Sequence, residues 1–430
     1  MINSTPKIRC IANTLTYSSI KRFSLFVYHF NYGEGVKDLN VNNSATTCIH
    51  GVHTAPKKIG PIASKIIPAV GYSFPDLDSA VDTVSGKVNG NFYGRYGNPT
   101  TQTLQSKIAI LEHGEASLGV SSGMAAISSA LLTFLQKDDH VICTKDVYGG
   151  SYKFLTNIAP RYGITTDFVD CTDIFAVEKV IRRNTKVLYI ETPSNPCLTI
   201  LDIGMLSELA HSYGLKVIID NTFMTPILQR PLDLGADIVV HSATKYLNGH
   251  GDVIAGFIVG DAESIDTMNK KMVGDLGQVQ NAWDSFLIDR GLKTLGVRMK
   301  QHCQSSMKVA EFLEQHPCIE RVYYPGLTSH PQHLLAKKQM KDMGGIVSFE
   351  LKGGYEEARR FINALKLAMI SFSLGDPETL VQHPATMTHA SVPLEEKLKC
   401  NITDRLVRIS IGLEDAEDII LDIEQALSKV

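Results

Sequence analysis

The feature that most constrains the fold is an alternation of short β-branched runs with helical periodicity between residues 105 and 290. The segment Asp202–Tyr213, for example, places Ile203, Leu206 and Leu209 on one helical face. The β-branched runs are His140–Thr144, Ile164–Asp170, Lys186–Glu191, Lys216–Asp220, Asp237–Ser242 and Ala255–Gly260. This alternation predicts an α/β fold, a largely parallel sheet with helices on both faces. Ligands of such sheets bind beyond the carboxyl ends of the strands, so residues at strand ends are the first functional candidates.

The sequence predicts three further regions around this α/β domain. Residues 1–45 carry four basic residues before the first acid, Glu34, and resemble a transit peptide, although a disordered tail or an upstream start fits them too. Residues 46–104 form an arm in which NGNFYGRYGNPT (89–100) mixes aromatics and an arginine with turn residues, which favours an ordered, functional segment. Residues 291–430 predict a smaller α+β C-terminal domain. Its expected strands and helices are Ile346–Leu351, Leu406–Leu413, Glu356–Leu365 and Ala416–Val430.

Composition narrows the function classes. Lys and Arg total 42 against 45 Asp and Glu, a net charge of −3, which argues against a nucleic-acid-binding protein. No apolar run approaches the roughly 18 residues of a membrane span. The eight cysteines are scattered without a C-x-x-C pair, which favours reduced thiols and a cytoplasmic protein, subject to the doubt about residues 1–45. His241 with His250, and His383 with His389, lack partners at metal-site spacing, so we expect no metal.

Chemically useful side chains follow two neighbouring strands. The run Lys216–Asp220 ends in a carboxylate, and Asp237–Ser242 is followed by Thr244 and Lys245. Taken alone, the lysine fits a solvated surface residue and the aspartate a turn residue. Together, a carboxylate, an amine and two hydroxyls suit pyridoxal 5′-phosphate (PLP), a cofactor with a basic ring, an aldehyde and a phosphate. The carboxylate would hold the ring nitrogen protonated, the lysine would form the Schiff base, and the two hydroxyls would bind the phosphate.

Other motifs add to this hypothesis. P-loop, G-x-G-x-x-G, G-x-S-x-G and H-E-x-x-H patterns are absent from the sequence. Ser121-Ser-Gly123-Met124 reads as a turn that opens an apolar helix, and a helix start binds phosphate well, although by itself it is an ordinary N-cap. Tyr148, after the strand at His140–Thr144, could stack on a planar cofactor or be a half-buried packing residue.

From about Thr47 to the C-terminus, motifs occur in the order of a known family. They are Tyr93-Gly-Arg95-Tyr-Gly-Asn-Pro-Thr, Ser121–Ala125, Glu191-Thr-Pro-Ser-Asn195-Pro, Asp220-Asn-Thr-Phe, Ser242-Ala-Thr-Lys245-Tyr, Ser373-Leu-Gly and Arg408-Ile-Ser-Ile-Gly. On these motifs the chain resembles the cystathionine/methionine γ-family of PLP enzymes, the trans-sulfuration enzymes. The resemblance implies fold type I, the aspartate-aminotransferase-like fold, with PLP as cofactor.

The resemblance also implies roles for individual residues. Lys245 would carry the cofactor and move protons between Cα and Cγ, Asp220 would pair with the ring nitrogen, and Tyr148 would stack on the ring and help to expel the γ-substituent. The phosphate would be bound by Gly123, Met124, Ser242 and Thr244, together with Tyr93 and Arg95 of a neighbouring subunit. The active unit would therefore be a homodimer, usually paired into a homotetramer. Arg408 would bind the substrate α-carboxylate, assisted by Asn195 and Ser373.

The substrate is less constrained. The family removes a γ-substituent and then either loses ammonia or accepts a thiol. Gly150 stands where methionine γ-lyases typically have a cysteine, whereas Phe372 stands where cystathionine-handling members typically have a glutamate. The stretch from Ser373 to His389 is most similar to methionine γ-lyases. We expect γ-elimination from methionine or homocysteine; the alternatives are cystathionine γ-lyase, γ-replacement on an O-acylhomoserine, and a non-catalytic family member.

Overall fold

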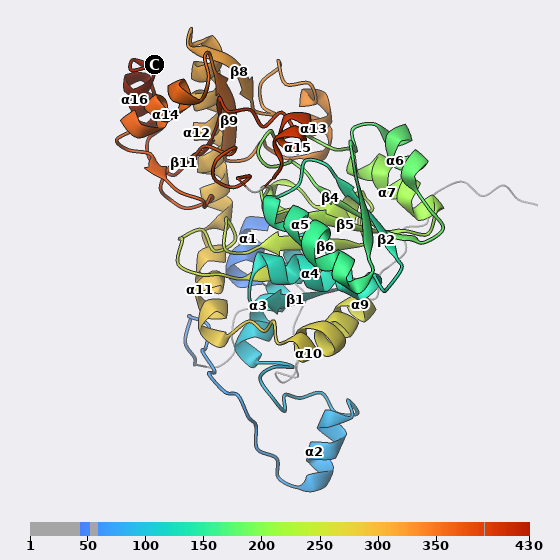
Figure 1. Ribbon diagram of the computed structural model, residues 1–430. Helices are drawn as coiled ribbons and strands as arrows, with labels where there is room; N and C mark the ends of the chain where they lie inside the picture. The colour runs from blue at the N-terminus through green and yellow to red at the C-terminus, as the bar shows by residue number, and fades with distance from the viewer. Residues whose placement is uncertain (1–43, 52–58, 391) are drawn as a thin grey trace, which may run out of the picture. The chain divides into compact units, whose positions relative to one another are not determined.

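A computed structural model describes residues 44–51, 59–390 and 392–430 (Figure 1). The chain divides into two units, Met1–Gly35 and Val36–Val430, and every described residue belongs to the second. The predicted extension 1–45 therefore lies outside the described residues, apart from Ser44 and Ala45, which begin helix α1. The predicted domain boundaries stay a prediction.

The larger sheet has seven strands in the order β1-β7-β6-β5-β4-β2-β3. They are β1 (Ala116–Val120), β2 (His140–Thr144), β3 (Thr165–Val169), β4 (Thr185–Glu191), β5 (Lys216–Asp220), β6 (Ile238–Ser242) and β7 (Gly256–Gly260). Strands β2 to β6 pair in parallel, while β7 is antiparallel to both β6 and β1. The prediction of a largely parallel sheet is confirmed. Strand β1 escaped prediction because it is not β-branched in its middle, where a Cβ on Gly119 would lie 2.0 Å from Oε1 of Gln280.

Helices cover both faces of this sheet. The helices of the described chain are α1 (Ser44–His50), α2 (Leu77–Val84), α3 (Pro99–Glu112), α4 (Gly123–Phe134), α5 (Gly149–Lys153), α6 (Ile174–Val180), α7 (Ile203–Ser212), α8 (Thr225–Leu228), α9 (Ala262–Thr267), α10 (Gly274–Leu276), α11 (Ala282–Leu292), α12 (Leu295–Gln315), α13 (His333–Gln339), α14 (Tyr355–Ala364), α15 (Leu394–Lys399) and α16 (Ala416–Leu427). Single 3-10 or π turns lie at Phe154–Ile158, Ala159–Tyr162, Pro231–Leu234 and Met268–Val273. Within the described ranges, none of these helices has the length and apolar character needed to cross a membrane.

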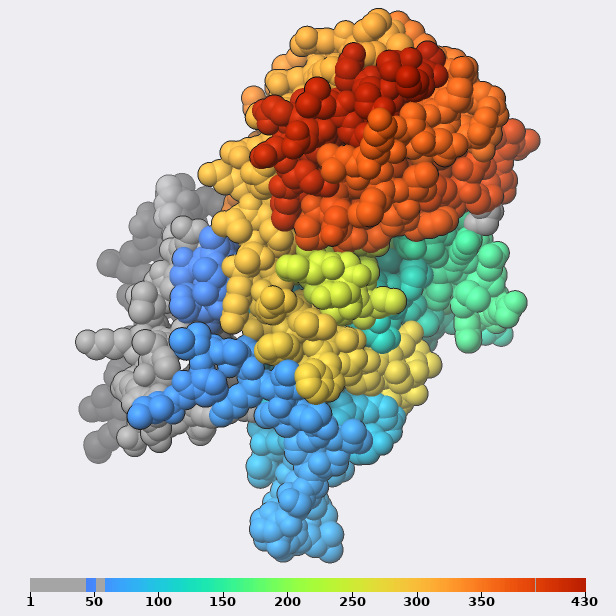
Figure 2. All heavy atoms as spheres, turned by 90° about the vertical axis from the view of Figure 1, so that its left-hand side faces the viewer, coloured from blue at the N-terminus to red at the C-terminus, as the bar shows by residue number. Residues whose placement is uncertain are grey.

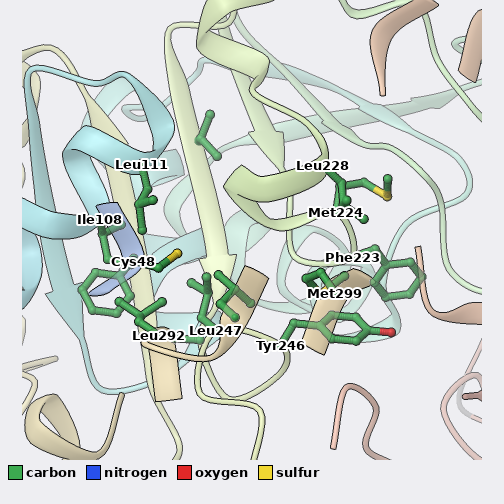
Figure 3. Packing of buried hydrophobic residues seen from close by; sticks show 14 of the residues in the cluster. Cys48, Ile108, Leu111, Phe223, Met224, Leu228, Tyr246, Leu247, Leu292 and Met299 are labelled. Atoms are coloured by element: carbon green, nitrogen blue, oxygen red, sulfur yellow. The ribbon is translucent and has the colours of Figure 1, made fainter. Parts of the chain in front are cut away.

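The strand side chains alternate between the two faces, as a period of two requires. Ile218 and Val240 pack with α4 on one face. On the other face, Ile219 packs with α7, and Val239 packs with α3, α11 and α12. Figure 3 shows part of this last cluster, in which Cys48 of α1 lies near Ile108 and Leu111 of α3 and Leu292 of α11. The sheet is thus buried on both faces, which leaves its strand ends as the place where polar groups meet.

A second, smaller sheet follows α12. Its order is β10-β11-β12-β9-β8, and its strands are β8 (Ile319–Tyr323), β9 (Ile346–Leu351), β10 (Met369–Ile370), β11 (Leu380–Gln382) and β12 (Leu406–Ser410). Helices α12, α14 and α16 pack on it around one apolar cluster. The predicted elements at 346–351, 356–365, 406–413 and 416–430 are found with ends shifted by at most three residues.

The arm before α3 lacks a core of its own. No residue of α2 is buried, and Leu77, Val81 and Val84 on it are exposed. In Figure 1 this blue segment extends away from the larger sheet, and the space-filling view of Figure 2 shows its light-blue atoms projecting into the open. A helix with an uncovered apolar side is typical of a segment that packs against another chain.

A buried ion pair joins α3 to α11. Nζ of Lys107 contacts Oδ1 of Asp289, and the two side chains are 5% and 6% exposed. Ser64 donates to the other carboxylate oxygen of Asp289, and Lys107 also donates to the carbonyl of Ile49. The pair therefore holds two segments of the arm against the helical layer.

Lys107→Met should lower the free energy of unfolding by about 3–5 kcal/mol, because it leaves the Asp289 carboxylate buried without its cation. Lys87→Met is the matched control: it breaks the exposed Lys87–Asp82 pair and should cost at most about 1 kcal/mol. Urea unfolding of the holoenzyme measures both. Equal losses in the two variants would contradict the structural role of the buried pair.

Candidate active site

The predicted cofactor residues meet at the carboxyl ends of β5 and β6. Asp220 ends β5, Ser242 ends β6, and Asp220 is opposite Val240 in the parallel register. The Ser242 backbone N–H donates to Oγ1 of Thr222 at 2.8 Å, and the Thr222 N–H donates to Oδ1 of Asp220 at 3.0 Å. The two strand ends are therefore linked to each other directly.

The start of α4 lies against the end of β6. A Cβ on Gly123 would be 2.7 Å from Cβ of Ser242, so only glycine allows this approach. Ser122 caps the helix by accepting from the N–H of Ala125 at 3.0 Å. Free N–H groups of a helix start beside a serine hydroxyl form a cradle suited to phosphate. The hydroxyl of Thr244, by contrast, is engaged with the backbone of Ala255 at 3.1–3.3 Å.

Tyr148 lies close to Met124, the second residue of α4. A Cβ on Gly150 would be 2.4 Å from Cε1 of Tyr148 and 2.9 Å from Sδ of Met124. Gly150 therefore lets the phenol ring fold back toward α4, where a larger residue would displace it. Tyr148 is 40% exposed, so part of its side chain is accessible for stacking.

Asp220 is a carboxylate without a cation. It is 8% exposed, and burial raises its pKa. Among the described residues no lysine, arginine or histidine forms an ion pair with it; its hydrogen bonds come from Thr222 and, at 3.5 Å, from the hydroxyl of Tyr189. A protonated pyridine nitrogen would supply the missing positive charge. The residues present thus fit PLP at both its phosphate and its ring nitrogen.

Lys245 is held as a weak base. Burial lowers the pKa of its amine, as does the nearby charge of Arg408, while Asp376 acts in the opposite direction. Nζ donates to Oγ of Ser373 at 3.2 Å. A lysine with a lowered pKa supplies the neutral amine that attacks an aldehyde, which is what covalent attachment of PLP requires.

Arg408 is a buried cation without an anion. It is 2% exposed, and burial lowers its pKa to about 10. Nη1 donates to Oδ1 of Asn195 and Nη2 to the carbonyl oxygen of Ser373, both at 3.0 Å. Within the described part of the chain it forms no ion pair. The structure thus brings together Arg408, Asn195 and Ser373 as predicted, in an environment that an incoming carboxylate would complete.

Two sets of predicted residues lie apart from this cluster. The guanidinium of Arg95 donates to the carbonyl of Gly274 in its own chain and stacks 4.9 Å from the ring centre of Tyr96, and Tyr93 is 44% exposed. Phe372 is 65% exposed, so its ring lies at the rim rather than inside. Their predicted roles stay predictions.

Sequence reasoning missed Glu191 as a functional residue. This carboxylate, 5% exposed, accepts from the backbone N–H of Tyr148 at 2.9 Å and of Asn195 at 3.1 Å. It thereby ties the stacking residue to the amide that contacts Arg408. Its position at the end of β4 was the available signal.

Asp376 was missed as well. It is 8% exposed, and burial raises its pKa, while the charge of Lys245 acts in the opposite direction. It is the negative charge that favours the ammonium form of Lys245. No sequence pattern distinguishes Asp376 from Glu378, because the charge of Asp376 reaches Lys245 only when the loop after β10 packs on the segment that follows β6, where a Cβ on Gly251 would lie 3.4 Å from the Asp376 carboxylate.

A fold and site of this kind define a PLP-dependent enzyme of fold type I. Comparison with known proteins agrees: residues 45–428 match the family described as Cys/Met metabolism PLP-dependent enzymes. The chain belongs to this family.

Individual relatives are similar over nearly the whole chain. An L-methionine gamma-lyase of Fusobacterium nucleatum subsp. polymorphum is 49% identical over 90% of this chain and 98% of its own. A second one, of Treponema denticola, is 46% identical over 92% and 99%. A cystathionine gamma-lyase of Bacillus subtilis is 45% identical over 90% and 99%. The crystal structure of MetB from Corynebacterium glutamicum superimposes with a TM-score of 0.86 at 38% identity, over 91% of this chain and 99% of that one.

These matches confirm several sequence-based predictions: the family, the fold class, PLP as cofactor, and a carbon–sulfur lyase. The predicted roles of individual site residues stay predictions that the geometry supports. No cluster of three or more His, Cys, Asp or Glu side chains suited to a metal occurs among the residues described.

Asp376→Asn should move the pH midpoint of PLP capture by the apoenzyme to lower pH. Only the neutral Lys245 amine reacts, and removing the neighbouring negative charge lowers the pKa of that amine further. Stopped-flow mixing of apoenzyme with PLP across pH measures the midpoint.

Glu378→Gln, which removes an exposed carboxylate two residues away, is the matched control and should leave the midpoint in place. Coincident midpoints for wild type and Asp376→Asn would show that Asp376 does not act on the lysine.

Proposed function

We propose that this protein is a methionine γ-lyase, which converts methionine and water into 2-oxobutanoate, ammonia and methanethiol. One observation carries the proposal: five relatives that are 43–49% identical over 89–92% of the chain are L-methionine gamma-lyases. The retained Lys245, Asp220 and Arg408 argue for a working enzyme rather than a non-catalytic family member.

The chain's own residues would divide the work as follows. Bound PLP supplies an electron sink for the negative charge that develops at the substrate Cα. Arg408 would hold the α-carboxylate and so orient the Cα proton toward the amine of Lys245. The same amine would return a proton to the carbon chain, because its lowered pKa lets it both accept and release one.

Tyr148 would protonate the departing thiolate. Burial raises the pKa of its phenol, and the charges of Glu191 and Asp220 act in the same direction. The phenol therefore keeps its proton at neutral pH and would donate it as the C–S bond breaks and negative charge develops on the sulfur.

A second candidate is γ-elimination from cystathionine. The Bacillus subtilis cystathionine gamma-lyase, at 45% identity, is nearly as similar as the methionine lyases. Phe372 argues against it: cystathionine has a distal charged ammonium, and an aromatic ring at the rim offers that charge no carboxylate. γ-Replacement on an O-acylhomoserine stays the remaining alternative.

We propose further that the active unit is a cytoplasmic homodimer, paired into a homotetramer. The uncovered apolar side of α2 and the exposed Tyr93 support an arm that packs on a second copy. The seven cysteines within the described ranges are free thiols, which supports a reducing compartment.

The substrate assignment is tested at Phe372. Methionine should have a higher kcat/KM than cystathionine, by roughly tenfold to a hundredfold, because an unmet charge-assisted hydrogen bond costs about 1.5–3 kcal/mol. Phe372→Glu should move the ratio toward cystathionine, chiefly through KM, and Phe372→Gln controls for loss of the ring. A wild-type enzyme with a higher kcat/KM for cystathionine than for methionine would contradict the proposal.

The shared site is tested by complementation. Arg95→Ala should weaken PLP binding, and Lys245→Ala should be inactive. If each site borrows the arm of its neighbour, mixing the two variants regenerates one intact site per dimer, so activity should return after subunit exchange. Mixtures that stay inactive despite verified exchange would mean that Arg95 serves its own chain.

A further inference from the structure

The groups that accept hydrogen bonds from the guanidinium of Arg408 are neutral. Besides Asn195 Oδ1 and the Ser373 carbonyl, its third neighbour is the side-chain amide of Gln382, which is fully buried. The amide oxygen lies 2.9 Å from Nη1, 3.1 Å from Nε and 3.2 Å from Nη2. This is the orientation that the amide must take, because the opposite one would set an NH2 group against a cation.

The three distances define how Gln382 contacts Arg408. A point about equally far from all three guanidinium nitrogens lies over the face of that planar group, not at its edge. The amide dipole therefore supports the cation from one face, while Asn195 and Ser373 occupy edge positions. Edge N–H groups are the ones that bind a carboxylate in the bidentate manner.

Strand pairing fixes this contact. Gln382 of β11 lies directly opposite Arg408 of β12 in the antiparallel register. Behind Gln382, the hydroxyl of Thr388 lies 3.3 Å from the amide oxygen and 3.0 Å from Nδ1 of His389.

The layer behind the amide is neutral as well. His389 is 2% exposed, and burial, with Arg408 and Lys397 nearby, lowers its pKa to about 4, so it is uncharged at neutral pH. Neither the Gln382 amide nor the Thr388 and His389 side chains behind it carry a negative charge that would compensate Arg408 on this side.

We propose that Gln382 is a positioning residue that fixes the Arg408 guanidinium across its face while leaving its charge free for the substrate α-carboxylate. A carboxylate in the same place would hold the guanidinium equally well but would neutralise it and repel the substrate. The inference rests on the proposed function, in which Arg408 binds the substrate α-carboxylate.

The decisive variant is Gln382→Glu, which keeps the size of the side chain and adds one negative charge. Norleucine and pentylamine are the probes. Norleucine has a methylene in place of the methionine sulfur, so it cannot undergo γ-elimination, and pentylamine is norleucine without its carboxylate. Dissociation constants for both are measured by calorimetry on the holoenzyme.

In the wild type, norleucine should bind at least tenfold more tightly than pentylamine. In Gln382→Glu this preference should shrink at least tenfold, with pentylamine binding changed less than threefold, and KM for methionine should rise more than kcat falls. A general loss of stability from a buried carboxylate would weaken the binding of both probes and leave the ratio of their dissociation constants unchanged. Gln229→Glu, made at a glutamine 2% exposed and bonded to Asn221 rather than to Arg408, is the matched control and should keep the wild-type ratio.

Gln382→Met covers the case in which the glutamate variant does not fold. It removes the amide dipole but adds no charge, so the norleucine preference should fall several-fold through loss of positioning. A preserved preference in either folded variant overturns the inference. A wild type that does not prefer norleucine would instead overturn the role of Arg408, and with it that part of the proposed function.

Discussion

The site depends on two buried, opposite charges, Asp220 and Arg408, that do not form an ion pair with each other. Asp220 and Arg408 are 8% and 2% exposed, and neither forms an ion pair within the described chain. Each costs several kcal/mol to remove from water. The extensive apolar packing on both faces of the larger sheet offsets that cost. The cofactor can then supply a pyridinium to Asp220, and the substrate can supply a carboxylate to Arg408. Pairing each buried charge in this way favours binding of the cofactor and of the substrate.

Strand register keeps the two charges apart and correctly aimed. Parallel pairing places Glu191 opposite Asp220, so β4 and β5 end at one level, and β6 continues two residues beyond Val240, which is opposite Asp220. Antiparallel pairing in the smaller sheet places Gln382 opposite Arg408. Glu191 couples the two sheets, since its carboxylate receives the N–H groups of Tyr148 and of Asn195, whose amide contacts Arg408.

The sequence predicts what is local. Asp220 and Lys245 follow recognisable strands, and the carboxyl ends of parallel strands share an edge, so their meeting could be inferred. Asp376 and Gln382 act through segments that lie far apart in the chain, and no local pattern marks them. Glu191 had only its position at the end of β4 as a signal. For Thr244 the residue type suits phosphate, and its hydroxyl bonds to the backbone of Ala255, so its role in phosphate binding stays a prediction. Strand β1 was missed because Gly119 has a low strand propensity. The glycine is required there by the close approach of the Gln280 side chain.

The charges around Lys245 help to explain how one lysine can take part in several proton transfers, because they set the basicity of its amine. Arg408 favours its neutral form and Asp376 its protonated form, and Ser373 contacts the amine directly. A substrate carboxylate bound to Arg408 would cancel the first influence and leave the second. The amine would then become a stronger base at the moment when the substrate Cα proton lies before it. Binding and proton abstraction are coupled in this way through electrostatics alone, and the coupling requires that no protein carboxylate neutralise Arg408 beforehand.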